Sequence, residues 1–173
     1  CQAIADFLTI KEEFRDLNDV VFTFVGDGNN VANSLILCGA LLGIKMRMAC
    51  PKGFEPNPKI IKLARQINEN IDLKVSNDPQ TAVIGSKVIY TDVWSSMGEE
   101  DEKEDKDKNF KGFSITNNLV RRAHEDVIVL HCLPAYRGKE ITDDVIESNM
   151  SRVFDQAENR LHVQQSLLAF LFS

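Results

Sequence analysis

The chain has 173 residues, of which 43% are apolar and 27% charged, which is the composition of one ordinary globular domain and is short for two. Its net charge of −6 disfavours a general role in nucleic-acid binding, because the phosphate backbone would be repelled. No apolar stretch approaches the roughly 20 residues that a membrane span needs, and the start of the chain lacks the basic region of a signal peptide. We therefore expect a cytoplasmic protein without membrane or nucleic-acid partners.

Helix and strand patterns alternate along the first half of the chain. Residues 1–14 place apolar side chains on one helical face, and this pattern begins without Met or a capping residue, as expected of a piece of a longer protein. The elements predicted next are a strand at 19–27, a helix at 29–44, a strand at 45–51, a helix at 56–70, a strand at 71–78 and a short helix at 79–86.

The alternation continues in the second half. The predicted elements are a strand at 87–94, a helix near 115–124, a strand at 126–134, a short helix at 141–148, a short extended piece at 152–156 and a closing helix at 158–172. The acid-rich stretch EEDEKEDKDK at 99–108 is typical of a solvated helix face or a mobile loop. The strands are short, continuous and apolar, as in sheets covered on both faces. The sequence thus predicts an α/β fold, with an open, mostly parallel Rossmann-like sheet and helices on both faces.

The chain has four cysteines, Cys1, Cys38, Cys50 and Cys132, without a C-x-x-C pair. No cluster of cysteine and histidine has the spacing of a zinc site. Free thiols in a reducing compartment are favoured over a disulfide scaffold, and no metal site is predicted.

Polar residues follow three of the predicted strands. GDGNN occupies 26–30, DVWSSMG occupies 92–98 and HCLP occupies 131–134, whereas the strand at 45–51 ends plainly in Cys-Pro. In open α/β sheets, ligands bind beyond the carboxyl ends of the strands. We therefore expect the functional site where these three segments meet.

GDGNN contains half of a dinucleotide-binding fingerprint. Val31 stands where that fingerprint needs Gly or Ala, and no acid closes the second strand to hold a ribose, so nucleotide binding is disfavoured. Asn29 and Asn30 stand at a predicted helix N-terminus, a place suited to a carboxylate. One of the two can cap the helix while the other faces a ligand.

Asp92 ends an apolar strand, where it can either cap the following turn or pair with a cationic amine. The loop Ser96-Met97-Gly98 follows, and its glycine allows the backbone to move as a lid does.

The adjacent pair His131 and Cys132 raises the possibility of a nucleophile beside its base. Neighbouring residues on a strand point to opposite faces, so this pair cannot form such a dyad in strand geometry. Cys132 is therefore predicted to be a polarisable contact in a binding site, and His131 to be structural.

The segments FVGDGNNVANSL, DVWSSMGEE, HCLPAYRGKEIT and VFDQAENR, in this order, resemble the ornithine carbamoyltransferase family. The opening CQAIADFLTI resembles the segment that includes the last residues of that family's His-Pro-x-Gln motif. The resemblance spans the whole chain and implies one domain of two in the aspartate/ornithine carbamoyltransferase fold, within a homotrimer. It implies an interdomain helix segment at 1–14, an ornithine-binding α/β domain at 15–155, and a C-terminal helix at 156–173 that returns toward an N-terminal domain.

The resemblance implies transfer of a carbamoyl group from carbamoyl phosphate to L-ornithine, giving L-citrulline and phosphate in arginine biosynthesis, without a cofactor. The ornithine contacts that it implies are Asn30, Asp92, Ser96 and Met97. The carbamoyl-phosphate contacts that it implies are Gln2, Cys132, Leu133 and Arg160. The resemblance also implies that Asp92 and Cys132 are the catalytic residues of this chain.

The family's Ser-Thr-Arg-Thr phosphate loop and the His of His-Pro-x-Gln do not occur in the chain, so we expect the chain alone to be inactive. Three alternatives remain open: a carbamoyltransferase for another amine such as putrescine or acetylornithine, a nucleotide-binding Rossmann module, and a catalytically inactive relative. The Ser96-Met97-Gly98 loop favours plain ornithine. An inactive relative is marked by loss of Asp92, Cys132 or Arg160, and all three are present.

Overall fold

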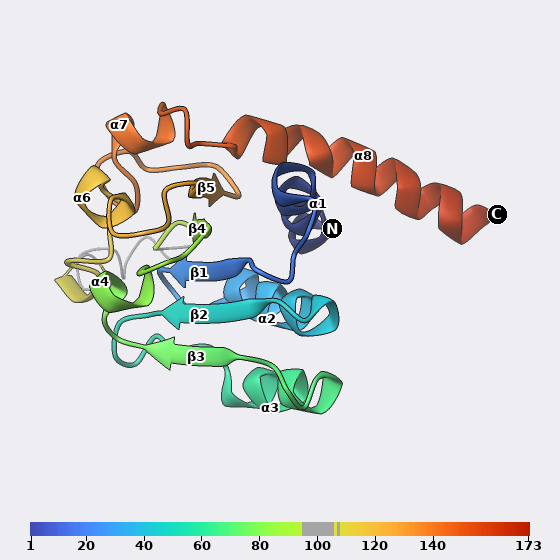
Figure 1. The fold of residues 1–173 in the computed structure, drawn as a ribbon, viewed down its shortest axis with the longest axis horizontal. Coiled ribbons are helices and arrows are strands. Elements are labelled where there is room, and N and C mark those ends of the chain that lie inside the picture. The colour runs from blue at the N-terminus through green and yellow to red at the C-terminus, as the bar shows by residue number, and fades with distance from the viewer. Residues whose placement is uncertain (95–105, 107) are drawn as a thin grey trace.

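The computed structural model describes residues 1–94, 106 and 108–173, and its centre is a five-stranded sheet (Figure 1). The strands are β1 (Val21–Val25), β2 (Lys45–Ala49), β3 (Leu73–Ser76), β4 (Val88–Thr91) and β5 (Ile128–His131). Their order across the sheet is β3-β2-β1-β4-β5, and each neighbouring pair is parallel. Each strand lies within a range predicted from the sequence, and the predicted α/β fold is confirmed.

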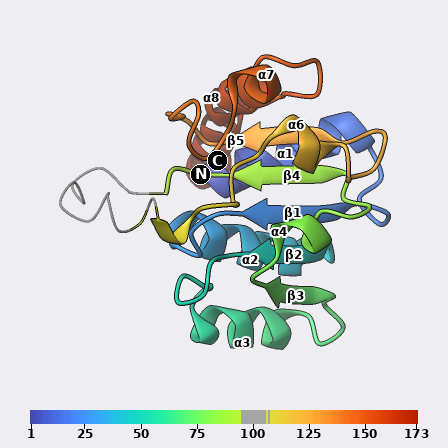
Figure 2. The same cartoon turned by 90° about the vertical axis from the view of Figure 1, so that its left-hand side faces the viewer.

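Helices cover both faces of this sheet, as Figure 2 shows. One face carries α1 (Gln2–Phe14), α2 (Asn30–Leu42) and α3 (Pro58–Ile67), and the other carries the short helices α4 (Pro79–Ala82), α6 (Asn117–Val120) and α7 (Asp143–Ile146). Side chains along β1 point alternately to the two faces of the sheet and so contribute to both hydrophobic cores. Phe22 and Phe24 pack toward α1 and α2, while Val25 packs in the core on the opposite face. The residues at 79–86, 115–124 and 141–148 form shorter helices than predicted, and most of the stretch at 99–108 lies outside the described residues.

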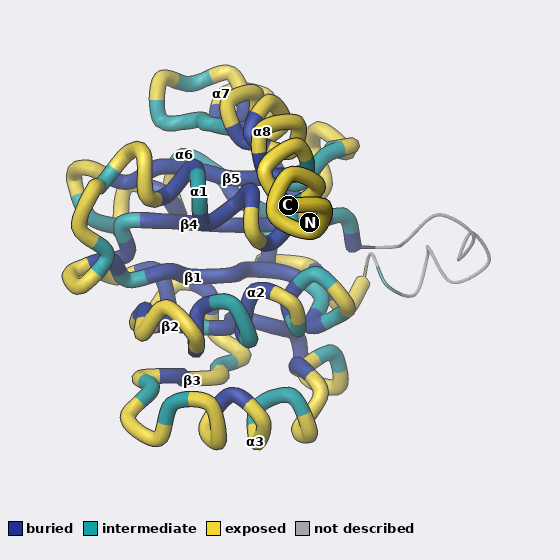
Figure 3. Tube along the Cα trace, turned by 90° about the vertical axis from the view of Figure 1, so that its right-hand side faces the viewer, coloured by how far each residue is buried: buried dark blue, intermediate teal, exposed yellow. Residues whose placement is uncertain are grey.

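The last helix, α8 (Val153–Phe172), packs its first half against α1, and its second half projects past the sheet (Figures 1 and 3). The side chain of Arg152 bonds both carboxylate oxygens of Glu13 at 2.9 Å, which fixes the start of the helix. The predicted extended piece at 152–156 is wrong, because these residues begin α8. Phe154 hid the helical pattern, since this aromatic residue is 70% exposed where an apolar helix face would bury it.

The strand order determines where a ligand can bind. From β1 the chain builds β2 and then β3 on one side, and it then crosses back to form β4 on the other side of β1. Such a switch point leaves a crevice at the carboxyl ends of the two central strands, here β1 and β4. In the part of the chain that the structure describes, no helix is both long and apolar enough to cross a membrane.

Candidate functional site

A pocket of about 270 Å³ opens at the carboxyl ends of the central strands. Its walls come from α1, the start of α2, the segments after β4 and β5, and α8. The lining residues are Gln2, Asn30, Val31, Asp92, Val93, Cys132, Leu133, Pro134, Tyr136 and Arg160. Six of the residues predicted from the sequence are among them, whereas Ser96 and Met97 lie outside the described residues.

The two asparagines that follow β1 have different roles. The side-chain oxygen of Asn29 accepts a hydrogen bond of 3.0 Å from the backbone N–H of Val31 and so caps α2. Asn30 is then free to line the pocket, as the sequence predicted for one of the pair. Gly28 has a packing role, because a Cβ atom there would lie 2.4 Å from the backbone nitrogen of Pro56. The second glycine of GDGNN is thus explained without a nucleotide.

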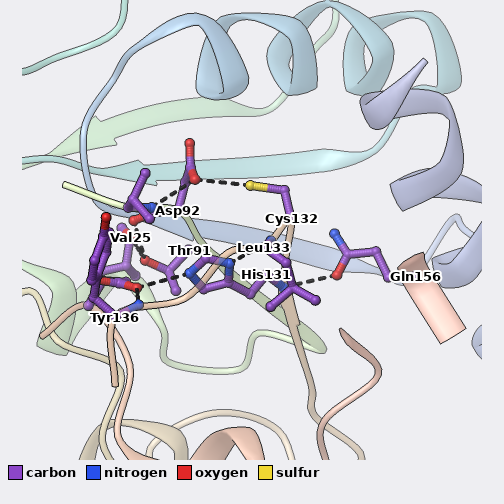
Figure 4. Close-up of polar contacts among 10 residues, drawn as sticks. Val25, Thr91, Asp92, His131, Cys132, Leu133, Tyr136 and Gln156 are labelled. Atoms are coloured by element: carbon purple, nitrogen blue, oxygen red, sulfur yellow. Dashed lines mark hydrogen bonds and ion pairs between the residues drawn. The ribbon is translucent and has the colours of Figure 1, made fainter. Parts of the chain in front are cut away.

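Asp92 is held rigidly at the end of β4. Its side chain is buried, and one carboxylate oxygen accepts hydrogen bonds from the backbone N–H of Val93 at 2.7 Å and from the thiol of Cys132 at 3.0 Å (Figure 4). A carboxylate fixed by two donors keeps its negative charge at one point on the pocket wall. This arrangement suits recognition of a cationic amine.

Cys132 is a hydrogen-bond donor in this site. Burial raises the pKa of its thiol well above the ordinary value, and the nearby carboxylate of Asp92 raises it further. The thiolate is the nucleophilic form of cysteine, and this site disfavours it. The structure therefore supports a binding contact and argues against a covalent nucleophile.

This protonated thiol leads to a chemical prediction. We expect iodoacetamide at pH 8 to modify the exposed Cys1 first and Cys132 at least about tenfold more slowly, because each raised pKa unit removes about nine-tenths of the thiolate. Mass spectrometry of the 173-residue chain over time measures both rates in one sample. Modification of Cys132 as fast as Cys1 would contradict the assignment.

His131 supports the backbone of the pocket wall. Its Nδ1 accepts a hydrogen bond of 2.9 Å from the backbone N–H of Leu133, so the ring proton lies on Nε2, which is 3.2 Å from an oxygen of the buried Glu140. The backbone N–H of His131 donates to the side-chain oxygen of Gln156 at 2.9 Å. His131 is thus structural, as predicted, and it makes no bond to the Cys132 thiol among the described contacts.

Asp92, His131 and Cys132 place three potential metal-ligand atoms within 4.8 Å of one another. Metal binding requires a free lone pair on the imidazole, but Nδ1 of His131 is occupied by Leu133 and Nε2 carries a proton toward Glu140. The chemistry of this donor set therefore favours a hydrogen-bonded network.

Leu133 adopts a left-handed backbone conformation, with φ of 55°, and its peptide bond to Pro134 is cis. A left-handed conformation costs a residue other than glycine roughly 1–2 kcal/mol. The hydrogen bond from the Leu133 N–H to His131 helps to offset this cost and keeps both residues on the pocket wall.

Glu140 gives a stability prediction. Its carboxylate accepts bonds from the His131 ring and from the backbone N–H of Tyr136. We expect Glu140→Leu to lower the free energy of unfolding by about 3 kcal/mol, because the buried His131 ring and the partly buried N–H of Tyr136 lose their acceptor, at about 1–3 kcal/mol for each unpaired donor. Glu140→Gln, which keeps an acceptor oxygen, should cost clearly less.

Urea unfolding of the 173-residue chain measures these differences. Glu125→Leu serves as the matched control, since this glutamate is exposed. Equal stability of Glu140→Leu and the control would show that the network around His131 contributes nothing.

Helices α1 and α8 supply the remaining polar groups. Gln2 donates from its side-chain nitrogen to Asp6 at 2.7 Å, and Arg160 stands exposed on α8 at the edge of the pocket. Sequence reasoning missed Tyr136 as a lining residue, although it lies close to HCLP. It also missed the supporting role of Glu140 and Gln156, for which short motifs carry no signal, because the contacts depend on the fold.

Comparison with known proteins decides the family. A family model described as "Aspartate/ornithine carbamoyltransferase, Asp/Orn binding domain" matches residues 18–171. The chain belongs to this family. It is 67% identical over 174 residues to an ornithine carbamoyltransferase of Prochlorococcus marinus (strain MIT 9312), and the match covers 100% of the chain and 56% of that relative.

Solved structures of the family share its fold. An ornithine carbamoyltransferase from Pyrococcus furiosus matches with a TM-score of 0.93 and 48% identity, covering 98% of this chain and 55% of that one. An anabolic ornithine carbamoyltransferase from Campylobacter jejuni matches with a TM-score of 0.90 and 38% identity, covering 98% and 57%. The chain thus spans little more than half the length of these relatives and matches the Asp/Orn-binding domain of the family.

Proposed function

We propose that the chain is the ornithine-binding half of an enzyme that transfers the carbamoyl group of carbamoyl phosphate to L-ornithine, giving L-citrulline and phosphate. The observation that carries this proposal is the pocket. Six residues that the family motifs implied come from five separate parts of the chain and line one cavity. The neighbours, which are named ornithine carbamoyltransferases, support the same reaction.

Ornithine fits one side of this pocket. Its α-carboxylate suits Asn30, which stands in the first turn of the 13-residue helix α2, where backbone N–H groups and the helix dipole favour an anion. Its cationic amines suit the fixed carboxylate of Asp92. Ser96 and Met97 are proposed as further ornithine contacts on the sequence motif alone.

Carbamoyl phosphate fits the opposite side. The guanidinium of Arg160 can bind phosphate oxygens in pairs, while Gln2, Cys132 and Leu133 surround the space beside it. In this proposal the two substrates meet near Cys132, between Asp92 and Arg160.

The proposed reaction requires a neutral amine. The side-chain amine of ornithine, with a pKa near ~10.4, must lose a proton before it attacks the carbamoyl carbon. Exclusion of water favours the neutral amine, and fixed contacts orient it. As the new C–N bond forms, the bond between the carbamoyl carbon and the phosphate oxygen breaks, and the surplus proton of the attacking nitrogen passes to the departing phosphate, whose charge Arg160 stabilises. Because the Cys132 thiol stays protonated, this mechanism has no covalent enzyme intermediate.

The proposal is tested with a hybrid enzyme, in which the part of the Prochlorococcus marinus relative that this chain does not match is joined to residues 1–173. We expect the hybrid to form citrulline and the 173-residue chain alone to form none. The hybrid should sediment as a trimer, the assembly that the resemblance implies.

Calorimetry with carbamoyl phosphate and each amine then decides the substrate. Tighter binding of putrescine or acetylornithine than of ornithine would replace the proposed amine. Absence of citrulline from a folded, trimeric hybrid would overturn the proposed reaction.

A further inference from the structure

Asp6 is a fully buried carboxylate behind the pocket, in the middle of α1. One of its oxygens, Oδ1, accepts a hydrogen bond of 2.7 Å from the side-chain nitrogen of Gln2 and one of 2.6 Å from that of Gln156. Its other oxygen accepts a bond of 3.1 Å from the Tyr90 hydroxyl. Gln2 alone among these partners lines the pocket.

The shared oxygen fixes which way both amides face. The side-chain oxygen of Gln156 accepts the backbone N–H of His131, so its nitrogen must point to Asp6. The Asp6 oxygen is thereby committed to accepting hydrogen bonds, and Gln2 must also present its nitrogen. Among the described contacts, none engages the side-chain oxygen of Gln2, and this oxygen remains for the pocket.

We propose that Asp6 is a positioning residue that turns the Gln2 amide so that its carbonyl oxygen faces the pocket and accepts a hydrogen bond from an NH₂ group of the substrate. This inference rests on the proposed function, in which that group is the nitrogen of the carbamoyl moiety. Asp6 itself is fully buried and is not among the residues that line the pocket described above. Its effect passes through Gln2.

The orientation has a consequence for specificity. A fixed acceptor oxygen forms a good bond with a carbamoyl NH₂ group, whereas the methyl group of acetyl phosphate offers it no donor. A site built to bond an N–H group rejects analogues that lack it, because the buried polar atom is left unpaired. Asp6 therefore contributes to the choice of carbamoyl phosphate over acetyl phosphate.

The charge on Asp6 is responsive to pH. Burial raises its pKa to about 6, while the bonds from Gln2, Gln156 and Tyr90 and the charge of Arg160 act in the opposite direction. The titratable groups around it are Tyr90 on β4, Cys38 on α2, Cys132 after β5 and Arg160 on α8.

The raised pKa of Asp6 makes the stability of the fold depend on pH. Folding is most favoured with Asp6 protonated, below its ordinary pKa of 3.8, and this contribution is lost as the pH rises to about 6. Above pH 6 the carboxylate is charged and holds both amides more strongly. Above pH 6 the charged Asp6 therefore lowers the stability of the fold and at the same time orients the Gln2 amide more firmly.

NMR of the ¹⁵N-labelled 173-residue chain tests the orientation without any activity. The Gln2 side-chain NH₂ resonances, assigned by their loss in Gln2→Glu, should lie away from the free-glutamine position and shift with a midpoint near pH 6. In Asp6→Asn the amide should stay at its folded position, since Asn keeps an acceptor oxygen, and the step near pH 6 should vanish. Asp19→Asn, which removes an exposed carboxylate, should leave the step unchanged.

Two outcomes of this titration overturn the inference. One is a Gln2 amide at the free-glutamine position in the unaltered chain. The other is a pH step that persists in Asp6→Asn.

Kinetics of the hybrid enzyme add a second readout. Asp6→Ala should raise KM for carbamoyl phosphate about tenfold and narrow the preference over acetyl phosphate, while KM for ornithine stays within about twofold. Asp6→Asn should restore both values, and unchanged carbamoyl-phosphate KM in a folded Asp6→Ala hybrid would contradict the inference. If Asp6→Ala fails to fold, the Asp6→Asn titration decides. If the unaltered hybrid forms no citrulline, the proposed reaction fails and the NMR titration still decides the role of Asp6.

Discussion

Asp92→Asn is expected to lower kcat/KM for ornithine in the hybrid enzyme by roughly 150- to 5,000-fold, since loss of one partner of a buried charge pair costs about 3–5 kcal/mol. Asn has the shape of Asp and keeps an oxygen for the Val93 N–H and the Cys132 thiol. The fold should therefore survive, and the loss should follow from the missing negative charge opposite the amine.

Steady-state citrulline assays with varied ornithine measure this effect, and thermal unfolding checks the fold. Asp19→Asn, an exposed aspartate in the turn after α1, is the matched control and should behave as the unaltered hybrid. A folded Asp92→Asn enzyme within about threefold of normal would remove Asp92 from the ornithine site.

Arg160→Gln is expected to raise KM for carbamoyl phosphate about 10- to 100-fold in the hybrid, with little change in stability. The side chain is exposed at the pocket edge, and hydrogen bonds to charged groups contribute about 1.5–3 kcal/mol. Arg160→Lys should recover only part of the loss, because an ammonium cannot bind two phosphate oxygens as a planar fork does.

Arg65→Gln is the control, because Arg65 is an exposed arginine on α3, at the opposite edge of the sheet (Figure 1). Inorganic phosphate should also inhibit the unaltered hybrid more strongly than Arg160→Gln. Equal phosphate inhibition of the two enzymes would show that Arg160 does not hold the phosphate group.

The strands and the edge that carries the pocket were predictable from sequence. Continuous apolar runs such as that around Phe22 and Phe24 identify strands buried on both faces, and parallel strands bring their polar carboxyl ends to one edge. The contrast between Asn29 and Asn30 was also predictable in kind, since only one of two adjacent residues can cap a helix. Which one caps required the structure.

The network behind the pocket was not predictable from local patterns. Asp6 and Gln156 are 150 residues apart, and Thr9 and Asn159 are equally separated, yet both pairs bond in the interior between α1 and α8. A buried polar residue such as Gln156 weakens the apolar periodicity that identifies a helix, as the exposed Phe154 does, and the first turn of α8 was therefore predicted as extended. The Ser96-Met97-Gly98 loop lies outside the described residues, so its prediction as a lid remains a prediction.

We expect the backbone amides of helix α8 to exchange with solvent by two different routes, one in each half of the helix. Near Gln156 and Asn159, whose buried side chains bond Asp6 and Thr9 on α1, we expect the backbone amides to exchange only when the whole domain opens. Toward Phe172, which is 85% exposed, the helix projects past the sheet (Figure 1), and we expect its amides there to exchange by local fraying. Protection should therefore fall along one continuous helix, and the residue at which it falls marks the end of the cooperative folding unit.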